Sequence, residues 1–166
     1  TAGMALSAVS FYGLAMTDFS SQQVQAWILM ALLGFSAASA LLASTAAIMA
    51  AAPAEKAAAA GAIETMAYEL GAGLGIAIFG LLLSRSFSAS ILPPAGLNPQ
   101  EMERASSSMG EAVQLAHSLP SSLSEALLTA AREAFTWSHS VALSSAGSML
   151  IVLAIGMWFS LAKVQR

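Results

Sequence analysis

Long stretches of apolar and small residues alternate with polar segments along this chain. The apolar stretches are residues 1–17, 26–51, 57–83 and 137–162. A helix rises about 1.5 Å per residue, so about 20 apolar residues cross the hydrocarbon core of a bilayer. We therefore predict an all-α membrane protein with four transmembrane helices, of which the first is complete or slightly truncated.

The connection between the second and third stretches, residues 52–56, is very short and contains Pro53. Proline ends one helix and is tolerated in the first turn of the next, so these two helices should form a tight antiparallel hairpin. Gly71 and Gly75 form a small-xxx-small pair in the third stretch. Such pairs let membrane helices approach closely, and the alternative is a bending point in a moving helix.

Residues 84–136 form a long polar insert that also carries apolar residues at helical spacing. Asn98, Pro99 and Glu101 are typical of a capped helix start, and Ser122 with Glu125 suggests a second one. We predict an amphipathic helical hairpin with a turn at residues 119–121. The alternatives are a solvated loop with frayed helices and a lid on the membrane surface.

The composition agrees with a membrane protein. Hydrophobic residues make up 57% of the 166 residues, charged residues only 9%, and the mean hydropathy is +0.74. Soluble domains carry about 25% charged residues. The chain starts within an apolar stretch, without an initiator methionine. We therefore expect it to begin inside a longer protein, and the alternative is the processed N-terminus of a complete small one.

Several function classes find no support in the sequence. A net charge of −3 without a basic run argues against a nucleic-acid partner. There is no cysteine, and His117 and His139 are isolated, so no metal site is expected. No nucleotide-binding or nucleophile motif appears. We expect neither an enzyme nor a bound cofactor.

The distribution of basic residues predicts the orientation in the membrane. Lys56 lies in the short link, and Lys163 and Arg166 lie in the tail at residues 163–166, on the same side if there are four spans. Basic residues concentrate in cytoplasmic segments. The link and the tail should therefore be cytoplasmic, and the insert extracellular or periplasmic.

Two carboxylates, Glu64 and Glu69, interrupt the third apolar stretch. A charged carboxylate at a bilayer centre costs about 2.5–3.5 kcal/mol on insertion scales, and none of the four stretches contains Lys or Arg. A separation of five residues corresponds to about 140° of rotation and 7.5 Å of rise. The carboxylates should therefore form two stations along one path, with Glu69 nearer the middle of the membrane.

A carboxyl group that is neutral in apolar surroundings and ionised in water can exchange a proton for a cation. Glu64 and Glu69 are therefore candidate proton- and substrate-coupling residues. The alternative is a pair of neutral carboxyls hydrogen-bonded to neighbouring helices. Tyr68 shares a helix face with Glu64.

The first apolar stretch and its end supply the other candidates. Phe11 and Tyr12 are candidate neighbours of a substrate path, as is Tyr68. Asp18 is a candidate outer-mouth residue at a membrane edge. The alternative for Asp18 is a solvated helix end.

The run GAIETMAYELGAGLGIAIFG, residues 61–80, resembles the penultimate span of the 14-span drug:proton antiporters of the major facilitator superfamily, of the QacA and SmvA type. The resemblance covers essentially the whole chain, as spans eleven to fourteen of that fold. It implies that the insert is a helical hairpin over the outer mouth. Glu64 and Glu69 match acidic positions of the span, and Thr65 stands where some members carry a further acid.

The resemblance implies proton-driven export of lipophilic cations, such as quaternary ammonium compounds and methyl viologen, from a bacterial inner membrane. The implied partners are the lipid bilayer, the cationic drugs and the upstream spans of the same transporter, which acts as a monomer. Two other interpretations remain open. The first is a complete four-span protein, either a small exporter or an accessory subunit. The second is a structural membrane module that transports nothing.

Overall fold

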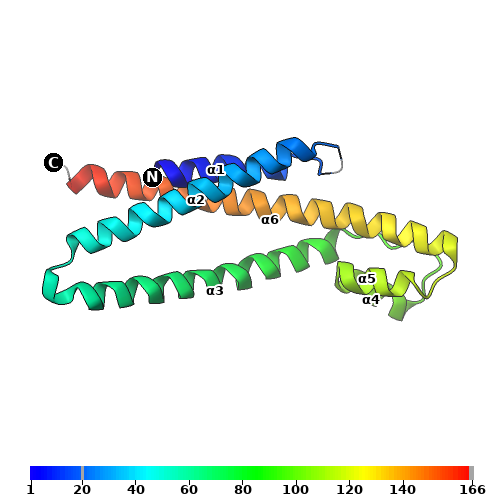
Figure 1. Cartoon of the computed structure of the whole chain (residues 1–166). Helices are drawn as coiled ribbons and strands as arrows, with labels where there is room; N and C mark the ends of the chain where they lie inside the picture. The colour runs from blue at the N-terminus through cyan, green and yellow to red at the C-terminus, as the bar shows by residue number, and fades with distance from the viewer. Residues whose placement is uncertain (20, 165–166) are drawn as a thin grey trace. The chain divides into compact units, whose positions relative to one another are not determined.

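The computed structural model describes residues 1–19 and 21–164, with side chains as far as Ser160. Residues 165 and 166, and with them Arg166 of the predicted tail, lie outside the described part, as does the side chain of Lys163. The regular elements are α1 (Ala2–Ala15), α2 (Gln23–Ala51), a short 3-10 helix (Ala54–Lys56), α3 (Ala57–Ser90), α4 (Pro99–Ser107), α5 (Met109–Ala116) and α6 (Ser121–Val164) (Figure 1). The all-α prediction is confirmed.

Within the described residues, three helical segments are long and apolar enough to cross a membrane, namely residues 23–51, 54–90 and 121–160. The first helix, α1, is apolar but shorter, with 14 residues. The chain divides into two compact units. The first comprises residues 1–77 and 143–166, and the second comprises residues 78–142.

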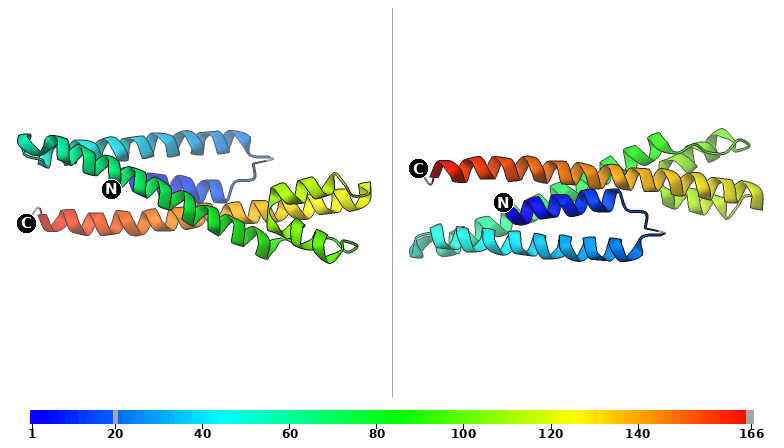
Figure 2. Two further views of the ribbon diagram at one scale, coloured as in Figure 1. Left: turned by 90° about the horizontal axis from the view of Figure 1, so that it is seen from below. Right: turned by 90° about the horizontal axis from the view of Figure 1, so that it is seen from above.

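In the first unit, α1 and α2 lie side by side in opposite directions (Figure 2). Small residues make this close approach possible. A Cβ added to Gly3 would lie 2.9 Å from the Ser36 carbonyl oxygen, and one added to Gly13 would lie 2.8 Å from a Leu29 methyl group. Between these contacts the hydroxyls of Ser7 and Ser36 are hydrogen-bonded at 2.7 Å. Close helix packing at glycines is thus found in α1, whereas the sequence pattern predicted it at Gly71 and Gly75.

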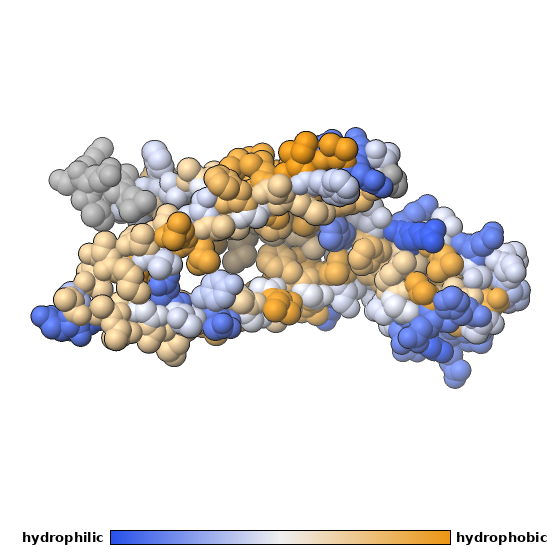
Figure 3. Space-filling model, viewed as in Figure 1, coloured by the Kyte–Doolittle hydropathy of each residue, from blue (hydrophilic) through white to orange (hydrophobic). Residues whose placement is uncertain are grey.

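The second unit has an apolar interior. One cluster of buried side chains comprises Phe87, Ile91, Ala112, Ala131 and Ala134, and another comprises Leu97, Ala105, Leu115, Ala116 and Leu127. The ends of α3 and α6 and both short helices contribute to these clusters. Hydrophilic side chains gather over α4 and α5 on the face drawn in Figure 3. Within residues 84–136, the segments 84–90, 99–107, 109–116 and 121–136 are therefore helical and contribute to these clusters, and residues 91–98 and 117–120 connect them.

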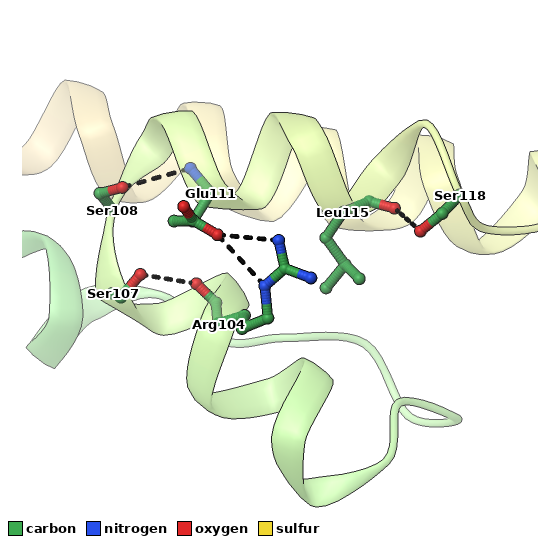
Figure 4. Close-up of polar contacts among 6 residues, drawn as sticks. All are labelled: Arg104, Ser107, Ser108, Glu111, Leu115 and Ser118. Carbon is green, nitrogen blue, oxygen red and sulfur yellow. Dashed lines mark hydrogen bonds and ion pairs between the residues drawn. The ribbon is translucent and has the colours of Figure 1, made fainter.

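The sequence predicts one continuous helix in the first half of the insert, but the structure has two, α4 and α5, with a break at Ser108. The backbone there is extended, with φ −164° and ψ 161°, and the Ser108 side chain caps α5 by accepting the Glu111 N–H at 3.2 Å. Arg104 of α4 donates to the Glu111 carboxylate from two nitrogens, at 3.0 and 3.2 Å, across the break (Figure 4). Serine is a preferred N-cap, and its side chain here starts a new helix instead of continuing the old one.

The helices on either side of the insert run past the ends of the apolar stretches. The third apolar stretch continues as helix to Ser90, and α6 begins at Ser121 and continues without a break through the last stretch. Neither 84–90 nor 121–146 contains Gly or Pro, which are the residues that most readily end a helix. A change from apolar to polar residues alone does not stop a helix.

The cap at Asn98 predicted from the sequence is present and gives a stability test. The Asn98 side chain accepts the Glu101 N–H, and the Asn98 N–H donates to the Glu101 carboxylate, both at 2.9 Å. Loss of such a cap costs about 1 kcal/mol. Asn98→Ala should therefore speed amide hydrogen exchange in α4 severalfold, whereas Asn98→Asp, which keeps the acceptor, should not. Equal exchange in Asn98→Ala and wild type would contradict this prediction.

Candidate functional site

Glu64, on α3, has a hydrogen-bond partner on the neighbouring helix. Its side chain is half-buried and accepts a hydrogen bond from the Thr45 hydroxyl of α2. Thr45 and Glu64 lie at nearly equal distances along the chain from the link at residues 52–56. α2 and α3 meet near the link and diverge from it (Figure 1), so the predicted tight hairpin is wrong along most of their length; close to the link, residues at equal distances from it lie opposite each other.

A second contact shows the same register. A Cβ on Gly61 of α3 would lie 3.2 Å from the terminal methyl of Met49 on α2. The pairing of Thr45 with Glu64 was missed in the sequence analysis, although the short link carried the signal. At nearly equal distances from the link, α2 carries the Thr45 hydroxyl and α3 carries the Glu64 carboxylate.

Glu69 has different surroundings. It is exposed and lines a surface hollow on α3 together with Ile63, Thr65, Met66, Ala67 and Leu70. Within residues 1–19 and 21–160, no hydrogen bond or ion pair is recorded for its side chain. The Thr65 hydroxyl donates a hydrogen bond of 3.0 Å to the Gly61 carbonyl oxygen. The two carboxylates are therefore distinct sites, and one of them has no protein partner in the described part of the chain.

The other candidate residues are not gathered around these carboxylates. Tyr12 donates or accepts a hydrogen bond of 2.6 Å with Ser148 of α6, and Phe11 beside it is half-buried. Asp18 is exposed and accepts a hydrogen bond of 2.7 Å from Ser21. Tyr68 is 57% exposed on α3. Tyr12 thus links α1 to α6 through its hydrogen bond to Ser148. Asp18 stabilises the turn after α1 through its hydrogen bond from Ser21.

The Gly71–Gly75 pair is open on its glycine face. No atom lies within 4 Å of a Cβ built at Gly71 or Gly75, nor at Gly73 or Gly80. By contrast, the glycines of α1 touch α2 closely. In the described residues, no group of three metal-ligating side chains comes together.

An all-α chain with several helices able to cross a membrane, one carrying two carboxylates, has the features of a membrane transport protein. Over all 166 residues it is 84% identical to the methyl viologen resistance protein SmvA of Salmonella typhimurium, in strains 14028s and LT2. It is 40% identical over 88 residues, 53% of the chain, to the multidrug efflux pump LfrA of Mycolicibacterium smegmatis, and this match covers 18% of LfrA. No protein-family model and no solved structure matches the chain.

These findings confirm the resemblance to SmvA-type multidrug efflux transporters of the major facilitator superfamily that the run at residues 61–80 predicts. The relatives are a resistance protein and an efflux pump, in agreement with the expectation that the chain is not an enzyme. The chain spans about a third (34%) of the length of the SmvA proteins.

Proposed function

We propose that this chain is the C-terminal part of a proton-coupled multidrug efflux transporter in a bacterial inner membrane. It exports lipophilic cations, with quaternary ammonium compounds and methyl viologen as the substrate class. The observation that carries this proposal is the pair of carboxylates on the apolar helix α3. The similarity to proteins named for methyl viologen resistance and multidrug efflux supports it.

The contacts of the two carboxylates favour different roles. Glu64 is half-buried and hydrogen-bonded to Thr45, so it is the proton-binding group. Glu69 lines an open hollow of mostly apolar side chains, which suits a lipophilic cation that needs both an apolar surface and a negative charge. Tyr68, Phe11 and Tyr12 are proposed as neighbours of the substrate path.

The proposed topology has four spans formed by α1, α2, α3 and the C-terminal part of α6. The link at residues 52–56 and the tail are cytoplasmic, and the helices of residues 84–136 are extracellular or periplasmic, with Asp18 at the outer mouth. The hydrophilic surface over α4 and α5 supports this arrangement. The rest of the transporter, the bilayer and the drugs are the partners, and the transporter acts as a monomer.

Two specific observations weigh against the other interpretations. Small four-span exporters have short loops and an acid in the first span, whereas this chain has a 53-residue insert (84–136) and its acids on α3. A structural module that transports nothing needs no carboxylates in an apolar helix, where they are costly.

Proton coupling can be tested on the full-length transporter in proteoliposomes. Addition of ethidium or methyl viologen on the side from which the drug is taken up should release protons in exchange, and a protonophore should abolish drug accumulation against its gradient. Drug transport that is unchanged by the protonophore would overturn the proposed coupling. Proton release without a cationic substrate would overturn the proposed exchange.

A further inference from the structure

We propose that Thr45 is a positioning residue that controls the protonation of Glu64 and couples it to the α2–α3 hairpin. This inference rests on the proposed function, in which Glu64 binds the transported proton. Thr45 contacts the Glu64 carboxylate and acts through this hydrogen bond. The hydroxyl donates to the carboxylate.

The immediate surroundings make this hydroxyl important. Thr45 lies on a helix whose 29 residues include no Asp, Glu, Lys, Arg or His. Gly61, one turn before Glu64 on α3, lies against Met49, so the hydrogen bond sits beside an apolar contact. A hydrogen bond to the charged form of a carboxylate favours that form, and apolar surroundings oppose it. The Thr45 hydroxyl is the polar group that the structure places against Glu64 to offset those surroundings.

No other charged group takes over this task in the described part of the first unit. Residues 2–15 and 143–160, which lie in α1 and α6, contain no acidic or basic residue. On α3 the other carboxylate is Glu69, and the ionisable Tyr68 is exposed. Lys56 and Glu55 lie at the link, two helical turns or more away from Glu64. The one ion pair recorded among the described residues joins Arg104 to Glu111 in the second unit.

The Thr45 hydroxyl has two alternative hydrogen-bond acceptors, the Glu64 carboxylate and a backbone carbonyl oxygen of its own helix. This choice gives Thr45 a role in coupling. When Glu64 takes up a proton, the carboxyl no longer needs a donor. A helical threonine can then turn its hydroxyl to the carbonyl oxygen four residues earlier in its own helix, as Thr65 does to Gly61 on α3. The protonated carboxyl can then donate to the Thr45 oxygen, so protonation reverses the direction of the hydrogen bond between α2 and α3, and deprotonation restores it.

The test uses three variants of the full-length transporter: Thr45→Val, which keeps the shape and loses the hydroxyl, Thr45→Ser, which keeps the hydroxyl, and Thr45→Ala. The measurement is the pH dependence of ethidium efflux, normalised to the amount of transporter in the membrane. The pH of half-maximal efflux should shift in Thr45→Val and Thr45→Ala, which lack the hydroxyl that contacts Glu64, and should stay near wild type in Thr45→Ser.

The same substitution in a Glu64→Gln background separates the possible outcomes. If Thr45 acts through Glu64, Thr45→Val adds no further shift there. An unchanged pH profile in Thr45→Val and Thr45→Ala, together with loss of proton coupling in Glu64→Gln, would overturn the inference and leave the proposed function standing. An equal shift in the Glu64→Gln background would also overturn it, because the effect would then be one of packing. Wild-type proton coupling in Glu64→Gln itself would contradict the proposed function.

Discussion

Glu69→Gln is expected to reduce ethidium and methyl viologen efflux by the full-length transporter about tenfold or more. Glutamine keeps the size and the hydrogen-bonding capacity of the side chain but cannot be charged. Coupling between two distinct binding sites is typically about 5–150-fold, and a neutral side chain at position 69 loses the part of the coupling that depends on its charge. The amount of transporter in the membrane should be unchanged, because Glu69 makes no recorded contact in the described residues that would hold α3 in place.

The controls for Glu69→Gln come from the same chain. Glu69→Asp keeps the charge and should retain part of the efflux. Glu125→Gln makes the same chemical change at an exposed site near the start of α6 and should transport like wild type. Efflux of both drugs at the wild-type rate in Glu69→Gln would show that Glu69 is not a coupling residue. Glu64→Gln is expected to lose proton coupling more than drug recognition.

Much of the fold was predictable because membrane-spanning helices can be recognised in a sequence by their length and apolar composition. The three long candidate spans overlap three of the apolar stretches, although two of them run well past the predicted ends. The cap at Asn98 followed from Asn, Pro and Glu at fixed spacing. The break at Ser108 was not predictable from apolar periodicity, because the row of residues 102–116 continues across it. A single serine side chain decides there whether one helix or two are formed.

The candidate site was predictable in its residues and not in their partners. Carboxylates in an apolar helix are visible in any sequence, because they are costly. Their separation around the helix axis followed from the helical repeat, and the structure has them in different surroundings. The partner on another helix depends on the register between helices, which side-chain volumes at several positions decide together. Only at the short link is the register fixed by the chain itself, and there Thr45 faces Glu64.

The sequence also could not show which glycines touch a neighbouring helix and which face open space. Twelve glycines look alike in the sequence, but those of α1 and Gly147 of α6 touch a neighbour, whereas Gly71 and Gly75 face open space. Lipid supplies no hydrophobic force that holds helices together, so close contact at small residues has to do so. An open glycine face on α3 is what a chain spanning a third of its relatives' length would leave for further helices.

Gly147→Leu should clearly destabilise the first unit, at the contact between α1 and α6. A Cβ at this position would lie 3.0 Å from two ring carbons of Tyr12 and 3.3 Å from the Ala8 carbonyl oxygen. Tyr12 cannot easily move, because its hydroxyl is bonded to Ser148 at 2.6 Å. Overpacking of this kind costs about 1–3 kcal/mol. The thermal unfolding temperature of the detergent-solubilised transporter should therefore fall by several degrees.

A second substitution distinguishes a steric cause from a general intolerance of leucine in α6. Combining Gly147→Leu with Tyr12→Ala removes the ring that the new side chain meets, so the pair should lose less stability than the sum of the two single changes. Gly156→Leu, at a glycine of the same helix with no atom within 4 Å of its Cβ position, is the matched control and should be milder. Strictly additive losses in the pair would mean that Tyr12 and Gly147 do not pack against each other in the membrane. Other residues would then have to form the contact between α1 and α6.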